Sequence, residues 1–254
     1  MTGSKACYVC VVGAFIAIMS CASAQAITCS NASITGIYGL LITGYNASGQ
    51  YQSGMGQINS NGKGGFTGIE TVSDDGVIFN NQSLTGTYSV SANCTGSGTI
   101  TNIKNGNISH YNFVVDPVAK TVEAAGTDSG HGTASGYAQA LGTATCSTAA
   151  AAGRYGFHGG GFLVGKGLLA FDGQFVLDGT GKVTGIETRS IDGTIVSASP
   201  FTGTYTLAST CRGTISYLFK GATVHLNIVM VNGGKSFFTI ETDLDTVATS
   251  VAQQ

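Results

Sequence analysis

The chain has 254 residues, of which 43% are apolar and only 9% are charged, and its net charge at pH 7 is −2. This apolar fraction suffices for a packed core and excludes wholesale disorder, and the length allows one large domain or two of ordinary size. The 11 Lys and Arg side chains are spread evenly, so no basic face exists to bind phosphates, which argues against nucleic acid and anionic membrane surfaces as partners.

Residues 1–26 have the layout of a cleaved secretory signal. Lys5 precedes an apolar stretch of 14 residues, 6–19, which is too short to span a bilayer because a helix needs about 20. Two overlapping Ala-x-Ala patterns follow at 22–26. We therefore expect a secreted or periplasmic protein. The residues that end at Cys21 also resemble a bacterial lipobox, so a lipoprotein anchored through Cys21 is the alternative, and no other segment is apolar enough for a transmembrane helix.

The rest of the chain is one sequence that occurs twice. A shift of 117 residues aligns 29–96 with the second copy and gives 26 identities in 68 positions without a gap. Further along, a shift of 115 residues aligns His110 with His225. Self-similarity at a fixed spacing indicates repeated structural units. We therefore predict one domain over 27–139 and a second over 146–254.

Each copy has the pattern of short antiparallel strands. Tyr111, Phe113 and Val115 alternate with more polar residues, which places them on one face of a strand. Glycine is abundant, at 39 residues, and Asn-Gly and Asp-Gly pairs recur as turn signals. A closed barrel of about eight strands is the favoured fold for each copy, because closure removes unpaired strand edges, and a two-sheet sandwich is the second choice.

A recurring set of turn and strand motifs resembles a known group of proteins. The residues that carry it in the first copy are Gly62, Lys63, Gly64, Gly86, Thr87, Tyr88, Cys94, Thr95 and Gly96. With their counterparts in the second copy they resemble secreted bacterial tandem-repeat proteins that look like allene oxide cyclase-like (calycin-related) β-barrels. The resemblance implies a barrel fold. The plant cyclases bind an unstable fatty-acid epoxide inside the barrel, but no motif of this chain matches their catalytic residues, so none is transferred.

Four cysteines remain after the signal segment. The duplication favours the pairs Cys29–Cys94 and Cys146–Cys211, because each copy then has its own disulfide across the same separation of 65 residues. An exported protein meets an oxidising compartment, in which disulfides persist. Zinc is the alternative use of these cysteines, but the sequence has no Cys-x-x-Cys pattern and no close His pair after the signal segment.

Few side chains are candidates for chemistry. Glu70 and Glu187 occupy equivalent positions and are weak candidates for catalytic residues, since a carboxylate that faced the barrel interior would have a raised pKa suited to acid–base work. A solvated strand residue, or one that is hydrogen-bonded to a turn, is the interpretation we favour. His110 and His225 are expected on the outer surface. No metal or other cofactor is predicted.

Four tyrosines recur in strands that are rich in glycine. We expect them to pack in the core, with stacking on a ligand as the alternative, which makes them weak candidates for ligand binding. They are Tyr38, Tyr88, Tyr155 and Tyr205.

Three functions remain open. The favoured one is a non-catalytic protein of the cell envelope or extracellular space with a structural or interaction role, in which any protein partner is one that the sequence does not identify. The alternatives are a binder of a small apolar ligand in each barrel, and an isomerase or cyclase that uses Glu70 and Glu187. The interior volume separates them: ligand pockets begin at roughly 300 Å³, and we expect an interior below about 100 Å³ to hold neither ligand nor substrate.

Overall fold

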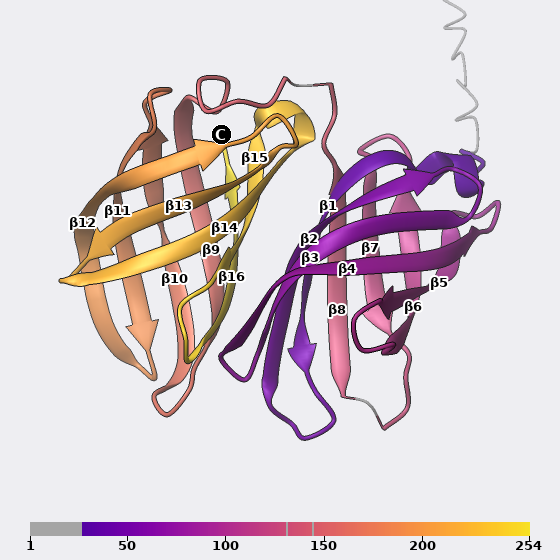
Figure 1. Cartoon of the computed structure of the whole chain (residues 1–254), viewed down its shortest axis with the longest axis horizontal. Helices are drawn as coiled ribbons and strands as arrows, with labels where there is room; N and C mark the ends of the chain where they lie inside the picture. Colours follow the sequence, from indigo (N-terminus) through magenta and orange to yellow (C-terminus); the bar gives the residue numbers. More distant parts are fainter. Residues whose placement is uncertain (1–26, 131, 144) are drawn as a thin grey trace, which may run out of the picture.

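A computed structural model describes residues 27–130, 132–143 and 145–254, which form two closed antiparallel β-barrels in tandem (Figure 1). The predicted signal segment, including Cys21, lies outside the described residues. Barrel 1 consists of β1 (Thr35–Tyr45), β2 (Tyr51–Asn61), β3 (Gly65–Asp74), β4 (Val77–Val90), β5 (Thr95–Asn102), β6 (Ile108–Asp116), β7 (Thr121–Gly126) and β8 (Thr133–Ala140). Barrel 2 consists of β9 (Gly153–Leu163), β10 (Gly167–Leu177), β11 (Lys182–Ile191), β12 (Thr194–Leu207), β13 (Arg212–Phe219), β14 (Ala222–Val231), β15 (Ser236–Glu241) and β16 (Thr246–Gln253).

The topology is the simplest that closes a barrel. Each strand pairs with the next along the chain, and the last strand of each barrel pairs with the first. Two-residue turns, Asp75-Gly76 and Asp192-Gly193, join β3 to β4 and β11 to β12, and all four residues have positive φ, as tight hairpin turns require. The predicted pair of eight-stranded barrels is therefore confirmed, and the sandwich is excluded. Among the described residues, no helix is long and apolar enough to cross a membrane.

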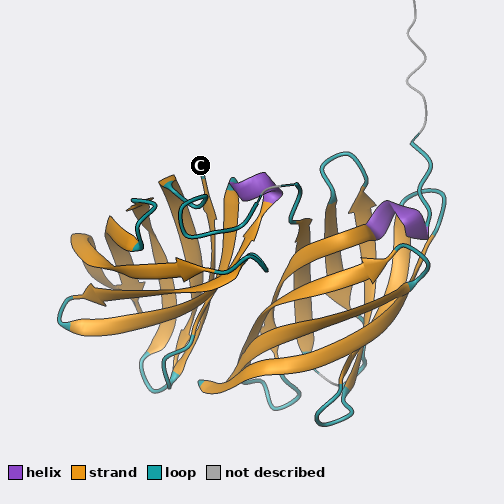
Figure 2. Cartoon of the chain, turned by 45° about the horizontal axis from the view of Figure 1, so that its top comes forward, coloured by secondary structure: helices purple, strands orange, loops and turns teal. Residues whose placement is uncertain are grey.

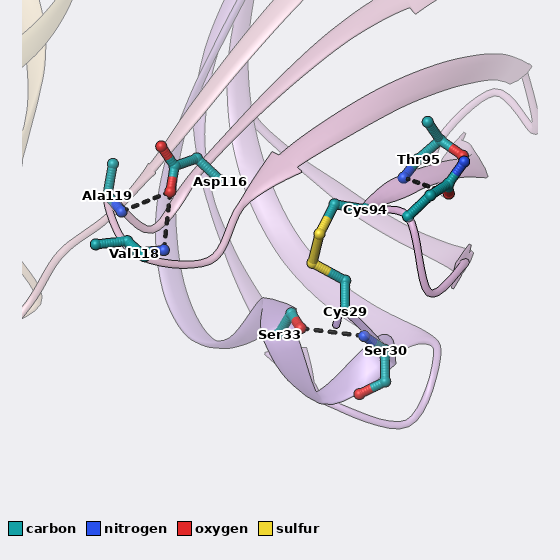
Figure 3. The surroundings of a disulfide bond; sticks show 9 residues. Cys29, Ser30, Ser33, Cys94, Thr95, Asp116, Val118 and Ala119 are labelled. Carbon is teal, nitrogen blue, oxygen red and sulfur yellow. Dashed lines mark hydrogen bonds between the residues drawn. A yellow bond between two sulfur atoms is a disulfide. The ribbon is translucent and has the colours of Figure 1, made fainter. Parts of the chain in front are cut away.

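A short segment closes one end of each barrel. In barrel 1 it contains the 3-10 helix η1 (Asn31–Ile34), whose last residue lines the interior (Figure 2). The disulfide Cys29–Cys94 fastens this segment to the turn before β5, with the two Cα atoms 4.9 Å apart (Figure 3). The disulfide Cys146–Cys211 does the same in barrel 2, with Cα atoms 5.0 Å apart. Both predicted disulfides are confirmed.

The two barrels are packed together through their outer faces. The face formed by β1–β3 lies against the face formed by β14–β16 (Figure 1). Ser73 Oγ donates to the carbonyl oxygen of Thr246 at 2.7 Å, and Asn227 Nδ2 donates to Thr71 Oγ1 at 3.0 Å. A glycine permits close approach, because a Cβ atom at Gly39 would lie 2.5 Å from Val231 Cγ1. The sequence did not predict this contact, which joins the barrels into one docked pair.

The surfaces that form this contact differ between the two copies. Val231 and Phe238 are buried in the contact. Their counterparts in barrel 1 are Asp116 and Glu123, which are exposed on the outer face of that barrel. A further barrel docked in the same way would bury Glu123 and Asp116, of which Asp116 accepts hydrogen bonds from the backbone N–H groups of Val118 and Ala119, at a cost in free energy. This difference disfavours repetition of the same head-to-tail contact into a filament.

Candidate functional site

The interior of barrel 1 holds the larger cavity. It has a volume of about 90 Å³, and all eight strands contribute to its wall. The side chains that line it include Tyr38, Leu40, Ile58, Phe66, Tyr111 and Phe113. The corresponding cavity of barrel 2 has a volume of about 30 Å³, which is close to the space of one water molecule. Both volumes are below the limit of about 100 Å³ that we set for a ligand or substrate.

Barrel 2 is fuller because more of its inward side chains are large, although Phe66, Tyr111 and Phe113 of barrel 1 are larger than their counterparts. Phenylalanine or tyrosine in barrel 2 replaces an aliphatic residue or glycine in barrel 1. The matching positions, with barrel 2 first, are Phe157 and Leu40, Phe171 and Gly54, Phe175 and Ile58, and Tyr217 and Ile100. The hollow in barrel 1 is therefore a property of its own sequence and does not follow from the shared fold.

The two equivalent glutamates are buried. Glu70 has 8% of its surface exposed and Glu187 has none, so our preferred interpretation of solvated strand residues is wrong. The strand pairing is irregular directly after each of them, between Glu70 and Val72 and between Glu187 and Arg189. Both carboxylates lie inside because their strands present them on the inward face, which also carries Phe66 in barrel 1.

In barrel 2 the glutamate belongs to a buried polar network, which we call the Arg189 network. It comprises Glu187, Arg189, Tyr217 and Glu241, all largely removed from solvent. Arg189 Nε donates to Glu187 Oε1, and Tyr217 OH donates to Glu187 Oε2 at 2.8 Å. Arg189 Nη2 donates to Tyr217 OH at 3.0 Å and lies 3.9 Å from Glu241 Oε2. Glu187 is thus neutralised from within the barrel.

The protonation of this network follows from burial and from the arginine. Burial alone would lower the pKa of Arg189, but Tyr217, Glu241 and Glu187 outweigh it and raise that pKa, so the guanidinium stays charged. Burial raises the pKa of Glu241 to about 7 although Arg189 opposes this, and the nearby Asp243 adds to the rise. Burial and Glu187 also raise the pKa of Tyr217. One guanidinium therefore faces two carboxyl groups, of which Glu241 is partly protonated near neutral pH.

Barrel 1 has the equivalent glutamate but not the arginine. Among the residues described, no Lys, Arg or His forms an ion pair with Glu70. Asn102 Nδ2 donates to Glu70 Oε1 at 3.5 Å, and burial raises the pKa of Glu70 to about 6 against this hydrogen bond. The guanidinium of Arg189 lies over two phenylalanine rings that barrel 1 also lacks. The residues at these three equivalent positions, with barrel 2 first, are Arg189 and Val72, Phe171 and Gly54, and Phe219 and Asn102.

We expect the same substitution to have opposite effects in the two barrels. The folded chain binds the proton of Glu70 more tightly than the unfolded chain does, so the free energy of unfolding falls as the pH rises from 4.5 to about 6. Glu70→Gln should remove this loss and raise the free energy of unfolding by about 2 kcal/mol above pH 6.5, with little change at pH 4. Glu187→Gln should instead lower it by about 1–3 kcal/mol at both pH values, because Arg189 loses a partner.

Denaturant titrations of the two variants and the wild type at pH 4 and pH 8 test this prediction. A destabilised Glu70→Gln protein at pH 8 would show that the carboxylate of Glu70 is stabilised by groups other than Asn102.

The four recurring tyrosines are buried and bond the end segments to the barrels. Tyr88 OH lies 2.7 Å from Ser60 Oγ and donates to the Ile34 carbonyl oxygen at 3.1 Å. Tyr205 OH donates to the Thr148 carbonyl oxygen at 2.8 Å. Their burial agrees with the core packing that we expected from their pattern. Two of them, Tyr38 and Tyr88, also line the cavity of barrel 1, and Tyr155 is stacked in the core of barrel 2.

Each barrel carries one histidine–aspartate pair on its outer surface. His110 Nδ1 lies 2.5 Å from Asp128 Oδ1, and His225 Nδ1 lies 2.6 Å from Asp243 Oδ1. The histidine side chains are 55% and 54% exposed, as predicted. The two aspartates are separated by 115 residues, as the two histidines are, but the sequence did not pair them with the histidines. Within the described residues, no group of three or more His, Cys, Asp or Glu side chains is placed to hold a metal ion.

Sequence reasoning missed the partners of Glu187. Arg189 follows it by two residues and so lies on the same face of the strand, and barrel 1 has Val72 at the equivalent position. A comparison of the two copies for unmatched charges would have found this arginine. Tyr217 and Glu241 come from β13 and β15, and no signal in the sequence brings them to the same place.

Two comparisons with known proteins found no match. No protein-family model matches the sequence, and no curated protein matches it significantly. The barrel architecture agrees with the fold that the motif resemblance implies.

Proposed function

We propose that the chain is an exported, non-catalytic protein of the cell envelope or extracellular space, in which two docked barrels serve as one structural or interaction unit. The observation that carries this proposal is the interior volume of about 90 Å³ and 30 Å³, against the roughly 300 Å³ at which ligand pockets begin. Arg189 holds Glu187, and Glu70 is not among the residues that line the cavity. The two disulfides support export, because they persist in oxidising compartments.

A direct test uses the activity implied by the resemblance to allene oxide cyclase-like barrels. The purified protein is mixed with an unstable fatty-acid epoxide, and the cyclic product is compared with that formed in buffer alone. We expect the same rate and the same product mixture, because neither interior admits a fatty-acid chain. Accelerated cyclisation by the wild type that is absent from Glu70→Gln would overturn the non-catalytic proposal.

One observation favours a second function, the binding of a very small apolar molecule in barrel 1 alone. The fold tolerates a filled interior, as barrel 2 demonstrates, whereas an empty cavity of about 90 Å³ costs about 2 kcal/mol at roughly 24 cal/mol per Å³. This second function departs from our expectation that an interior below about 100 Å³ holds no ligand. An apolar cavity of about 150 Å³ accepts benzene, so a cavity of roughly three-fifths that volume suits an apolar group of about four carbon atoms.

A further inference from the structure

We infer that barrel 1 binds a small organic ammonium ion, whose apolar part occupies the cavity and whose charge pairs with Glu70. This inference rests on the second function proposed above and adds the chemical class of the ligand. It follows from a comparison of the two barrels, because each contains the same buried carboxylate in a different electrostatic setting.

Barrel 2 shows which group pairs with the buried carboxylate when the same barrel supplies a cation. Glu187 is paired with the guanidinium of Arg189, which is supplied by the same strand. In barrel 1 the equivalent of Arg189 is Val72, and no described residue supplies a cation to Glu70. A buried carboxylate without a cation is unfavourable, and a positive charge beside it removes much of that cost. A bound ligand is the remaining source of such a charge within the barrel.

The cavity lies close to this charge, although Glu70 itself does not line it. Phe66 and Glu70 lie on the inward face of β3, and Phe66 lines the cavity. Asn102, which donates to Glu70 at 3.5 Å, follows the cavity-lining residue Ile100 by two residues along β5. The small residues Gly54 and Val72 stand where barrel 2 has a phenylalanine ring and the arginine. The site therefore has an apolar part and an adjoining negative charge.

The arrangement favours an ammonium ion over a neutral molecule. A charge-assisted hydrogen bond to a carboxylate is roughly twice as strong as a bond between neutral groups, and it is stronger in a buried site than in water. The cavity of about 90 Å³ restricts the apolar part to a few carbon atoms. Short alkylammonium ions such as n-butylammonium meet both conditions.

The test is a titration of the full mature chain with n-butylammonium, followed by two-dimensional amide NMR spectra at pH 8. The neutral probe 1-butanol has the same size and no charge. We expect n-butylammonium to shift the amide signals of barrel 1 with a dissociation constant of about 1–10 mM, the range for so small a ligand, and 1-butanol to bind at least tenfold more weakly. Signals of barrel 2 should not shift.

Two variants test whether the ammonium group of the ligand pairs with the carboxylate of Glu70. Glu70→Gln should weaken n-butylammonium binding at least tenfold and leave 1-butanol binding unchanged. Val72→Arg should abolish n-butylammonium binding, because it supplies barrel 1 with the cation that barrel 2 already has. Glu123→Gln, which removes an exposed carboxylate from the outer face of the same barrel, is the control and should bind like the wild type.

The outcomes separate the two proposals. Equal binding of n-butylammonium and 1-butanol, unchanged in Glu70→Gln, would disprove the inferred ligand class and leave the apolar site intact. Absence of binding by both probes at 50 mM would disprove the apolar site as well. If Val72→Arg does not fold, Glu70→Gln alone decides the question, because it changes one atom type without changing the size of the side chain.

Discussion

Arg189→Met should lower the free energy of unfolding by about 3–5 kcal/mol at pH 8, which is a large loss for a single substitution. The guanidinium is buried with Glu187, Tyr217 and Glu241, and its removal leaves two carboxyl groups without a cation in the interior of barrel 2. Breaking a buried ion pair by removing one partner has a cost of this size. Guanidinium chloride titrations followed by circular dichroism measure it.

Two controls separate the effect of the lost charge on stability from the effect of the changed side-chain shape. Val72→Met changes the equivalent position of barrel 1 without altering any charge, and it should cost less than about 1.5 kcal/mol. Adding Glu187→Leu to Arg189→Met should restore part of the lost stability, since replacing both members of a buried pair is cheaper than removing one. A loss of under about 1 kcal/mol for Arg189→Met, equal to that of the Val72 control, would mean that the network contributes no net stability.

The sequence predicted those parts of the fold that depend on local chemistry and on the repeat. Asp75-Gly76 predicted a tight turn because glycine and aspartate tolerate positive φ, and the structure has that turn. The shared separation of 65 residues predicted the pairs Cys29–Cys94 and Cys146–Cys211. Alternation along β6 placed Phe113 in the interior correctly.

The sequence could not predict which face of β3 is inward. Ile69 and Phe66 lie on opposite faces of that strand, so each face carries an apolar side chain, and only closure of the barrel decides that Glu70 is buried. The contact between the barrels does leave a signal in the sequence: Ile228–Val231 is apolar at every position, as expected of a strand buried on both sides. Even so, the sequence does not say which surface covers it.

The disulfides give the second large effect, and its consequence should differ between the barrels. Each one closes a loop across 65 residues, so loop-closure entropy gives about 4 kcal/mol for either. Barrel 1 has less stability in reserve, because it contains the larger cavity and the unpaired Glu70. The double variant Cys29→Ser/Cys94→Ser should therefore unfold in two steps, with barrel 1 melting first.

The matched variant Cys146→Ser/Cys211→Ser should lose a similar free energy of unfolding, but from barrel 2. This loss brings the stability of barrel 2 closer to that of barrel 1, so we expect this variant to unfold in a single transition. Calorimetry of both variants and the wild type without reductant measures the number of transitions. Wild type treated with dithiothreitol should melt at a lower temperature than either variant, since it loses both disulfides. The asymmetry has one physical source, namely that the two copies share the fold and its disulfide while their interior side chains fill one barrel and leave the other hollow. Identical melting profiles for the two double variants would contradict that reasoning.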